Sequence, residues 1–436
     1  MPRRRYPAAA MAHPLDTLTE RGFVQDVTDS DGLRELLSAG RVTFYHGADP
    51  SASSLHIGNL IGLMAMAWLQ RAGHRPIALV GGGTGRIGDP SGRDDERELL
   101  TDEQIASHVE RLRHQMTRVI DIDDPDRGLL IDNDDWLRGL RLVDFLRDVG
   151  RHFSVNQMIA RESVRRRLEE REHGISFTEF SYQLLQAYDF AHLFGTVGCR
   201  LQIGGSDQWG NITAGVDLTR RMHGEKVYGL VWPLVERSDG KKFSKSGGEA
   251  VWLAADETSP YAYYQWFLNV PDADVGRFLK LYTFLPMGEI AELEKATVAD
   301  PAGRPAQRTL ATEATRIMHG DDGLTEARRA SDALFGDEPF ADLDEQTLAD
   351  AFLGAPSTEL PPERLVQGIG LLELLVAAGA AASNGEARRL VEQGGVRLNN
   401  TVADDPAHTV GRADLIGDGT VVLRVGKKRY FLVRFR

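Results

Sequence analysis

The chain has 436 residues, a formal net charge of -13 and 42% hydrophobic residues, which is enough apolar material for more than one core. No apolar run reaches membrane-spanning length, and the amino terminus lacks the hydrophobic stretch of a secretory signal, so we expect a cytoplasmic protein without a membrane anchor. Cys199 is the only cysteine, which excludes disulfides within the chain and thiolate zinc sites and fits a reducing compartment. Met11 is a second candidate, beside Met1, for the initiating residue.

The first core elements surround the stretch FYHGADPSASSLHIGN, residues 44–59. RVTFY predicts a first strand, and the apolar residues that follow predict a buried helix from near Leu55 to Gly73. PIALVG predicts a second buried strand. Strand, helix and strand together predict a parallel βαβ unit with a right-handed crossover.

The start of that helix is a candidate nucleotide site. A helix start presents unpaired N–H groups and partial positive charge, which favour phosphate. His56 and Asn59 lie three residues apart and share one helical face, while Ser51, Ser53 and Ser54 offer hydroxyls as caps. A histidine at this position is also commonly a cap or a surface residue, and that alternative stays open.

Gly83, Gly85 and Gly88 match the pattern G-x-G-x-x-G, which would indicate an NAD-dependent oxidoreductase. We reject this interpretation because residues 89–92, Asp-Pro-Ser-Gly, interrupt the helix that should come directly after the glycines. The next segment also predicts a long charged helix in place of a strand that ends in an acid. The glycines instead allow the backbone to pass close to a bound substrate.

Polar residues come directly after the second and third predicted strands. Asp89 lies after the second strand, where open α/β sheets bind ligands. Arg93 and Arg97 come next, and a phosphate-clamping role and a solvated surface are both open for them. LLIDN is a third strand candidate that ends at Asn133, and we expect Asn133 and the nearby Trp136 to reach the same crevice.

The helix predicted for FTEFSYQLLQAYDFAHLF carries a polar stripe. Tyr182, Gln186 and Asp189 fall at i, i+4 and i+7 on one face of it. Burying an unpaired amide or carboxylate costs roughly 1–3 kcal/mol, so the stripe predicts a ligand or a polar partner. The alternative is a helix edge that faces water.

Two later segments complete the candidate site. RLQIGG predicts a short strand, after which Gln208 could bind a carboxylate and Asp207 a ribose hydroxyl, although capping of the next helix explains Asp207 nearly as well. SDGKKFSKSGG predicts a polar loop that contains Lys241, Lys242 and Lys245. Such cations suit a reaction in which pyrophosphate departs, although many lysine loops are merely soluble.

The carboxyl-terminal part of the chain predicts further domains. Residues from Ser259 onward are helical in pattern, PSTELPPER predicts a linker, and two short helices and several strands come after it. The predicted divisions are 1–40 as a lead-in, 41–250 as an α/β domain, 251–353 as a helical domain, 354–366 as a linker and 367–436 as an α+β module.

The last strands are basic, with no acid after Thr420. Lys427, Lys428 and Arg429 are the candidates for contact with an RNA backbone. The alternative is a basic edge strand that discourages aggregation.

The motifs HIGN, GDPSGR, SYQLLQAYD, GGSDQWGN and KFSKS occur in this order, and with them the chain resembles the bacterial-type tyrosyl-tRNA synthetases, a class I aminoacyl-tRNA synthetase family. The resemblance extends from about Phe44 to the carboxyl terminus. It implies a Rossmann-like parallel-sheet catalytic domain, an α-helical domain on the anticodon side and a small RNA-binding module. It also implies a homodimer that uses ATP with Mg²⁺ to form tyrosyl-adenylate and then charges tRNA(Tyr), without a tightly bound cofactor or a protein metal site.

Residue roles come from the same resemblance, position by position. Those implied to bind tyrosine are Tyr45, Asp89, Tyr182, Gln186, Asp189 and Gln208. Those implied to bind ATP are Gly47, Asp49, His56, Asn59, Gly205, Asp207 and Lys245. Those implied to be catalytic are His56, Asn59, Lys242, Lys245, Arg93 and Arg97, of which the two lysines, aided by the two arginines, would hold the pyrophosphate.

Two positions depart from the family signatures: Asn59, where histidine is frequent, and Phe243, where methionine is frequent. Because Asn can still donate a hydrogen bond, we expect a changed affinity for ATP with activity retained. Two further alternatives remain, a tryptophanyl-tRNA synthetase and a non-catalytic RNA-binding protein on a synthetase scaffold. An indole does not require the pair Tyr45 and Asp189, and a non-catalytic protein would not need Lys242 and Lys245.

Overall fold

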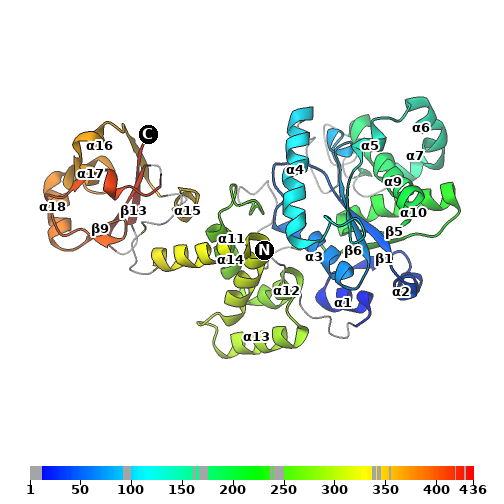
Figure 1. Cartoon of the computed structure of the whole chain (residues 1–436), viewed down its shortest axis with the longest axis horizontal. Coiled ribbons are helices and arrows are strands. Elements are labelled where there is room, and N and C mark those ends of the chain that lie inside the picture. The colour runs from blue at the N-terminus through cyan, green and yellow to red at the C-terminus, as the bar shows by residue number, and fades with distance from the viewer. Residues whose placement is uncertain are drawn as a thin grey trace. The chain divides into compact units, whose positions relative to one another are not determined.

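The computed structural model describes residues 12–91, 100–160, 164–165, 175–235, 238, 250–335, 340, 345–352, 355–417, 419–426 and 429–436. The chain forms two compact units, Met1–Leu253 with Val270–Leu310, and Ala254–Asn269 with Ala311–Arg436 (Figure 1). The domain boundaries expected from the sequence stay predictions.

A six-stranded sheet in the order β1-β6-β5-β2-β3-β4 is the centre of the first unit. Its pairs are parallel except β1 with β6, so the lead-in residues before 41 add an antiparallel edge to a parallel sheet. This confirms the predicted α/β class. The strands are β1 (Asp26–Val27), β2 (Thr43–Ala48), β3 (Arg75–Val80), β4 (Leu129–Asp132), β5 (Cys199–Gly205) and β6 (Tyr228–Trp232).

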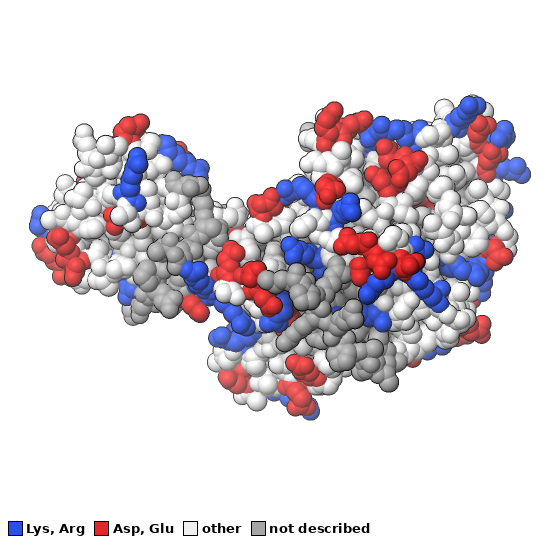
Figure 2. Space-filling view, viewed as in Figure 1, with Lys and Arg blue, Asp and Glu red and all other residues white. Residues whose placement is uncertain are grey.

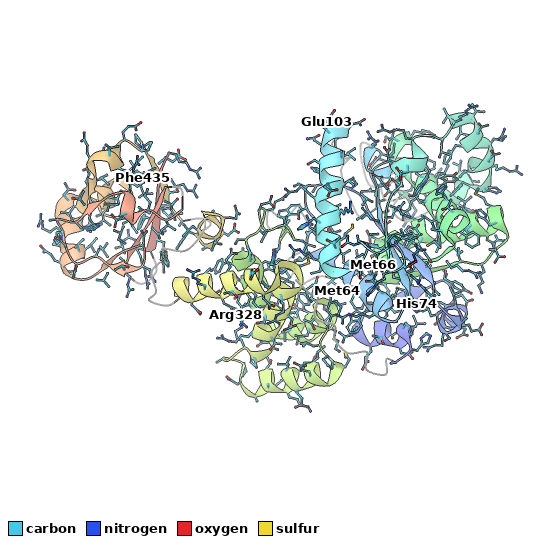
Figure 3. All side chains as sticks on the ribbon, in the orientation of Figure 1. Met64, Met66, His74, Glu103, Arg328 and Phe435 are labelled. Atoms are coloured by element: carbon cyan, nitrogen blue, oxygen red, sulfur yellow. The ribbon has the colours of Figure 1, made fainter. Side chains whose placement is uncertain are left out.

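Helices cover both faces of this sheet because neighbouring residues of a strand point to opposite sides. In β2, the Tyr45 ring packs edge-on against Phe190, with ring centroids 5.3 Å apart, whereas His46 lies against Gly62. Met64 and Met66, labelled in Figure 3, are fully buried on the same helix as Gly62. The helices of this unit are α1 (Pro14–Arg21), α2 (Ser30–Ala39), α3 (Ile57–Arg71), η1 (Thr84–Arg86), α4 (Asp102–Val119), α5 (Asp134–Leu137), α6 (Leu142–Asp148), η2 (Gly150–His152), α7 (Val155–Ile159), α9 (Phe177–Val197), η3 (Ser206–Gln208), α10 (Trp209–His223), α12 (Asp272–Tyr282) and α13 (Met287–Ala299).

The strand order reverses between β2 and β5. The chain passes from β2 to β3 and β4 on one side, and then returns to place β5 and β6 on the other. In open α/β sheets, ligands bind outside the carboxyl ends of the strands at this reversal. The fold therefore directs attention to the residues at the ends of β2 and β5.

The second unit combines helices with a second sheet in the order β10-β9-β12-β13-β7. β8 and β11 form a separate antiparallel pair of strands in the same unit. The predicted helical stretch and the predicted α+β module are both present. The elements are α11 (Pro260–Leu268), α14 (Pro305–Phe335, broken at Gly320, and starting within the residues of the first unit), α15 (Glu345–Ala351), β7 (Ser357–Leu360), α16 (Arg364–Gln367), β8 (Ile369–Gly370), α17 (Leu371–Ala377), α18 (Asn384–Glu392), β9 (Val396–Leu398), β10 (Thr401–Val402), β11 (Thr409–Val410), η5 (Arg412–Asp414), β12 (Thr420–Val425) and β13 (Arg429–Phe435).

The segment predicted as a linker, residues 354–366, contributes β7 to this second sheet. β7 pairs in parallel with β13, and Ser357 lies opposite Leu432. The proline-rich composition misled the prediction, because prolines on either side of a short edge strand leave its ladder hydrogen bonds intact. β13 also has two buried faces: Phe435, labelled in Figure 3, packs with α17 and α18, whereas Leu432 packs with Phe340 and Phe352.

Candidate active site

The polar stripe of α9 faces polar partners across the end of β2 and β4. Tyr182 Oη donates to Asp49 Oδ2 at 3.0 Å, and Gln186 Nε2 donates to Gln208 Oε1 at 3.3 Å. Asp189 is 1% exposed. The alternative of a helix edge that faces water is therefore wrong for Asp189 and Tyr182, both of which are buried.

Asp189 is held by two donors from the segment after β4. Asn133 Nδ2 donates to Asp189 Oδ2 and Trp136 Nε1 donates to Asp189 Oδ1, both at 2.9 Å. Burial raises the pKa of the Asp189 carboxyl to about 8, although these two N–H groups oppose the rise. Asn133 and Trp136, expected from the sequence to lie near these residues, thus both contact Asp189.

Tyr45 completes this end of the site from β2. Its hydroxyl is buried and has no hydrogen-bond partner among the described residues. Burial first, and the nearby Asp189 carboxylate second, raise the pKa of the Tyr45 phenol. A buried hydroxyl without a partner beside a buried carboxylate is costly in the free protein, and a ligand that bonds to both groups removes that cost.

A second network links this end to the glycine-rich turn after β3. Asn133 Nδ2 also donates to Thr84 Oγ1 at 3.0 Å, and Thr84 Oγ1 donates to Asp49 Oδ1 at 2.8 Å. Position 81 requires glycine unless Asp49 moves, because a Cβ there would lie 2.0 Å from Asp49 Oδ1. Directly after Gly83 the chain forms the short 3-10 turn η1, which agrees with the rejection of a dinucleotide-binding turn.

The opposite end of the site lies after β5. Gln208 Nε2 donates to Asp89 Oδ2 at 2.7 Å, and Asp207 Oδ2 lies 3.3 Å from the same nitrogen. Burial, and then the neighbouring Asp89 carboxylate, raise the pKa of Asp207. Asp207 does not cap α10, whose N-cap is Gln208 without a side-chain bond, so the capping alternative is wrong. Gly205 must also stay small, because a Cβ there would lie 2.5 Å from Asp207 Oδ1.

The start of α3 differs in detail from the prediction. His56 itself is the N-cap: Gly58 N–H donates to His56 Nδ1 at 3.0 Å, and His56 N–H donates to Asn59 Oδ1 at 3.1 Å. The prediction that Ser51, Ser53 or Ser54 caps the helix is wrong. A cap role and a nucleotide role are compatible, since the cap uses one ring nitrogen of His56 and the amide oxygen of Asn59.

Three residues near this site were missed from the sequence. Thr84 joins Asn133 to Asp49, Gln202 of β5 is 3% exposed with its Oε1 unpaired among the described residues, and His46 lies next to Tyr45. A signal existed for Gln202, because an amide within an otherwise apolar buried strand needs a partner as much as the stripe of α9 does. His46 donates from Nδ1 to Ile203 O at 3.2 Å, and burial lowers its pKa to about 4.

Some predicted residues lie outside the described part of the chain. They are Arg93, Arg97, Lys242, Lys245, Lys427 and Lys428. Gly47 is described and exposed at the end of β2, and Arg429 is exposed at the start of β13.

Comparison with known proteins identifies the fold and the family. The family "tRNA synthetases class I (W and Y)" matches residues 37–336, and the family "Tyrosine--tRNA ligase SYY-like C-terminal domain" matches residues 347–433. A tyrosine–tRNA ligase of Roseiflexus castenholzii is 51% identical over 422 residues, covering 96% of this chain and 99% of that protein. One of Desulfosudis oleivorans is 49% identical over 432 residues, covering 97% and 99%.

Solved structures agree with this assignment. A C-terminally truncated mitochondrial tyrosyl-tRNA synthetase of Aspergillus nidulans is 32% identical, with a TM-score of 0.67, and the match covers 74% of this chain and 95% of that one. A tryptophanyl-tRNA synthetase of Encephalitozoon cuniculi, 13% identical with a TM-score of 0.53, shares the fold alone. The chain therefore belongs to the class I tRNA synthetases of the tryptophan and tyrosine group and, within it, to the family of tyrosine–tRNA ligases.

Proposed function

We propose that the cluster around Asp189 is the tyrosine site of this tyrosine–tRNA ligase and that the start of α3 is its ATP site. The single observation that carries the proposal is the buried pair of Asp189, held by two N–H donors, and Tyr45, whose hydroxyl has no described partner. A phenol can donate to the carboxylate and accept from the hydroxyl at once. Neither phenylalanine nor an indole offers both bonds.

The other polar groups suit the charged end of the amino acid. The Asp89 carboxylate, beside Gln208 and Gln186, would receive the substrate ammonium, and the Gln208 amide would bind the substrate carboxylate. Tyr182 would contact the same charged end of the substrate, and its bond to Asp49 fixes the position of its hydroxyl. Because these residues come from α9 and from the segments after β2, β3 and β5, the substrate would lie across the reversal in strand order.

ATP would extend from this point toward the start of α3. The N-terminus of that 15-residue helix favours phosphate oxygens. Gly47 is exposed and leaves backbone accessible to the nucleotide, and Gly205 lies beside Asp207, which would bind the ribose. His56 and Asn59 would bind near the transferring phosphate. Lys242, Lys245, Arg93 and Arg97 stay predicted contacts of the pyrophosphate.

Mg²⁺ would be carried by the phosphates of ATP. Among the described residues, no group of three His, Cys, Asp or Glu side chains could hold a metal ion. Bound in this way, the ion would offset phosphate charge.

The chemistry requires positioning and charge more than a covalent nucleophile. The tyrosine carboxylate attacks the α-phosphorus of ATP, forming the acyl-phosphate bond of tyrosyl-adenylate as pyrophosphate leaves. A terminal ribose hydroxyl of the tRNA then attacks the acyl carbon, and AMP leaves as the ester bond forms. Residues that fix both ends of tyrosine therefore act mainly by aligning the carboxylate with the α-phosphate.

A homodimer is the assembly we propose. Several large apolar side chains of α6, α7 and the first residue of α9 are exposed, among them Leu142 at 71%, Val143 at 75% and Phe177 at 79%. Exposed apolar residues concentrated in one part of the surface mark interaction sites. A second copy of the chain is the partner we assign to them.

The second unit would bind the tRNA, with the basic end of its sheet as one contact. Arg429 is exposed and Arg424 lies across the hairpin, its guanidinium 5.5 Å from the Tyr430 ring centre. Figure 2 shows basic and acidic side chains interspersed on the visible face. Because phosphate contacts depend on local charge, a net charge of -13 is compatible with basic residues that bind RNA. None of the helices in the described residues has the length and apolar character needed to cross a membrane, and a cytoplasmic location stays part of this proposal.

The experiment that tests the function is amino-acid-dependent exchange of pyrophosphate into ATP, measured with each of the twenty amino acids. We expect exchange with tyrosine to be far faster than the slow exchange measured at high concentrations of phenylalanine or tryptophan. Exchange driven by tryptophan alone would favour the tryptophanyl alternative, and no exchange with any amino acid would favour the non-catalytic one.

A further inference from the structure

One face of α4 holds the segment that leads into the proposed ATP site. His108 Nδ1 lies 2.9 Å from Pro50 O, and Arg111 Nε donates to Ser53 O at 2.8 Å. Gln115 Oε1 accepts from the Leu55 N–H at 2.9 Å. Positions 108, 111 and 115 are spaced three and four residues apart, so the three side chains share one face of the helix.

The segment they hold, residues 50–55, has no regular structure of its own. It connects the end of β2 to the N-cap His56 of α3, so its backbone groups depend on partners from elsewhere in the fold. On another side, Leu253 N–H donates to Leu55 O at 2.8 Å and Ile57 N–H donates to Val251 O at 3.0 Å. The segment is thus fixed between α4 and residues 251–253.

We propose that His108, Arg111 and Gln115 are positioning residues for ATP, acting through the segment 50–55 on the orientation of His56 and Asn59. The inference rests on the proposed ATP site at the start of α3. None of the three needs to touch the nucleotide. Their effect should therefore fall on ATP and largely spare tyrosine, whose proposed contacts come from α9, β2, Asp89 and the residues after β5.

Gln115 is the most informative of the three because its surroundings are buried. Gln115 is 5% exposed, Ser54 and Leu55 are each 4% exposed, and the Ser54 hydroxyl lies 3.3 Å from the same oxygen of Gln115. Without an acceptor at position 115, the Leu55 N–H would be buried and unpaired, next to the residue that caps α3. The backbone would then shift toward another acceptor and move His56 with it.

The test compares Gln115→Met, which keeps the shape and removes the acceptor, with Gln115→Glu, which keeps the acceptor. The carboxylate of the Glu variant would lie four residues from Arg111 on the same face, which favours it in this position. Arg118→Met, on the exposed last turn of α4, is the matched control. The full chain is assayed by tyrosine-dependent pyrophosphate exchange for the KM of ATP, the KM of tyrosine and kcat.

We expect Gln115→Met to raise the KM for ATP about tenfold, which is about 1.4 kcal/mol, because ATP would have to return the displaced segment to its binding position. The KM for tyrosine should stay within about twofold, because Tyr182 alone among the proposed tyrosine contacts is linked to the segment, through its bond to Asp49 next to Pro50. Gln115→Glu should restore most of the loss, and Arg118→Met should match the wild type. If Gln115→Met does not fold, His108→Leu, a partly exposed position, replaces it with the same expected selectivity for ATP.

Two outcomes would overturn the inference: an unchanged KM for ATP, or equal changes in both KM values with no recovery in Gln115→Glu. Equilibrium dialysis, which measures binding of ATP without tyrosine, distinguishes failure of the positioning role from failure of the proposed function. A wild type that shows no tyrosine-dependent exchange refutes the function, whereas weaker ATP binding in Gln115→Met would still support the positioning role.

Discussion

Replacing Asp189 with asparagine tests the tyrosine site most directly. The substitution keeps the size of the side chain and removes the charge that would accept the substrate phenol, so the assay is run above about pH 8, where the Asp189 carboxyl of the free protein is ionised. A hydrogen bond to a charged group contributes about 1.5–3 kcal/mol. At about 1.4 kcal/mol per factor of ten, the loss corresponds to a fall of about 10- to 150-fold in kcat/KM for tyrosine.

Part of the effect should appear in stability. In the Asp189→Asn variant, one amide N–H would face either Trp136 Nε1 or Asn133 Nδ2, whichever way the amide is turned, because both neighbours are donors. A buried donor left without an acceptor costs about 1–3 kcal/mol. We therefore expect a lower free energy of unfolding in this variant.

Tyr45→Phe is the matched comparison. Its hydroxyl has no described partner in the free protein, so its removal should leave stability unchanged or raise it. A neutral hydrogen bond contributes about 0.5–1.5 kcal/mol, which predicts a loss of about 2- to 12-fold in kcat/KM for tyrosine. The two variants should thus differ in size of effect and in stability.

The assay is pyrophosphate exchange with tyrosine and with phenylalanine, together with urea unfolding of each variant. Because phenylalanine makes no bond to Asp189, the ratio of tyrosine to phenylalanine activity should fall by the same factor as tyrosine activity. A ratio that changes less than about twofold in Asp189→Asn would refute the assignment of Asp189 to the phenol. An equal loss with both amino acids would point to a general distortion of the site.

Three further predictions concern stability and assembly. Gly62→Ala should lower the free energy of unfolding by about 1–3 kcal/mol, because a Cβ there would lie 2.5 Å from His46 Nε2, and adding His46→Ser should restore most of it in denaturant unfolding. Burial raises the pKa of Asp189 to about 8 in the folded protein, whereas the same carboxyl titrates at about pH 4 in the unfolded chain. Between these pH values the folded state binds one more proton than the unfolded state, so the contribution of Asp189 to stability falls as pH rises. Because His46, whose pKa is lowered to about 4 by burial, contributes the opposite slope in both proteins, the prediction concerns the difference: the free energy of unfolding of the wild type minus that of Asp189→Asn should fall as pH rises across this range. Combining Leu142→Asp with Val143→Asp should change the mass measured by light scattering from twice 48.2 kDa to 48.2 kDa, and an unchanged mass would remove this surface from the dimer contact.

The sequence by itself determined the local elements and the order of the motifs. The βαβ unit, the long helix with its polar stripe and the basic hairpin at the end all result from periodicity and from residue preference, which act over a few turns of chain. The stripe also showed that Tyr182, Gln186 and Asp189 needed partners, since an apolar helix does not place such groups on one face without them. Periodicity did not identify the partners.

Only the tertiary structure decided which groups meet. Asp189 receives its donors from Asn133 and Trp136, more than fifty residues earlier, and Gln208 reaches back to Asp89. Those meetings depend on the return of the chain from β4 to β5, which brings the ends of distant strands to one edge of the sheet. The cap of α3 and the pairing of β7 were misjudged for the same reason, because both are settled by backbone partners that a single stretch of sequence does not contain.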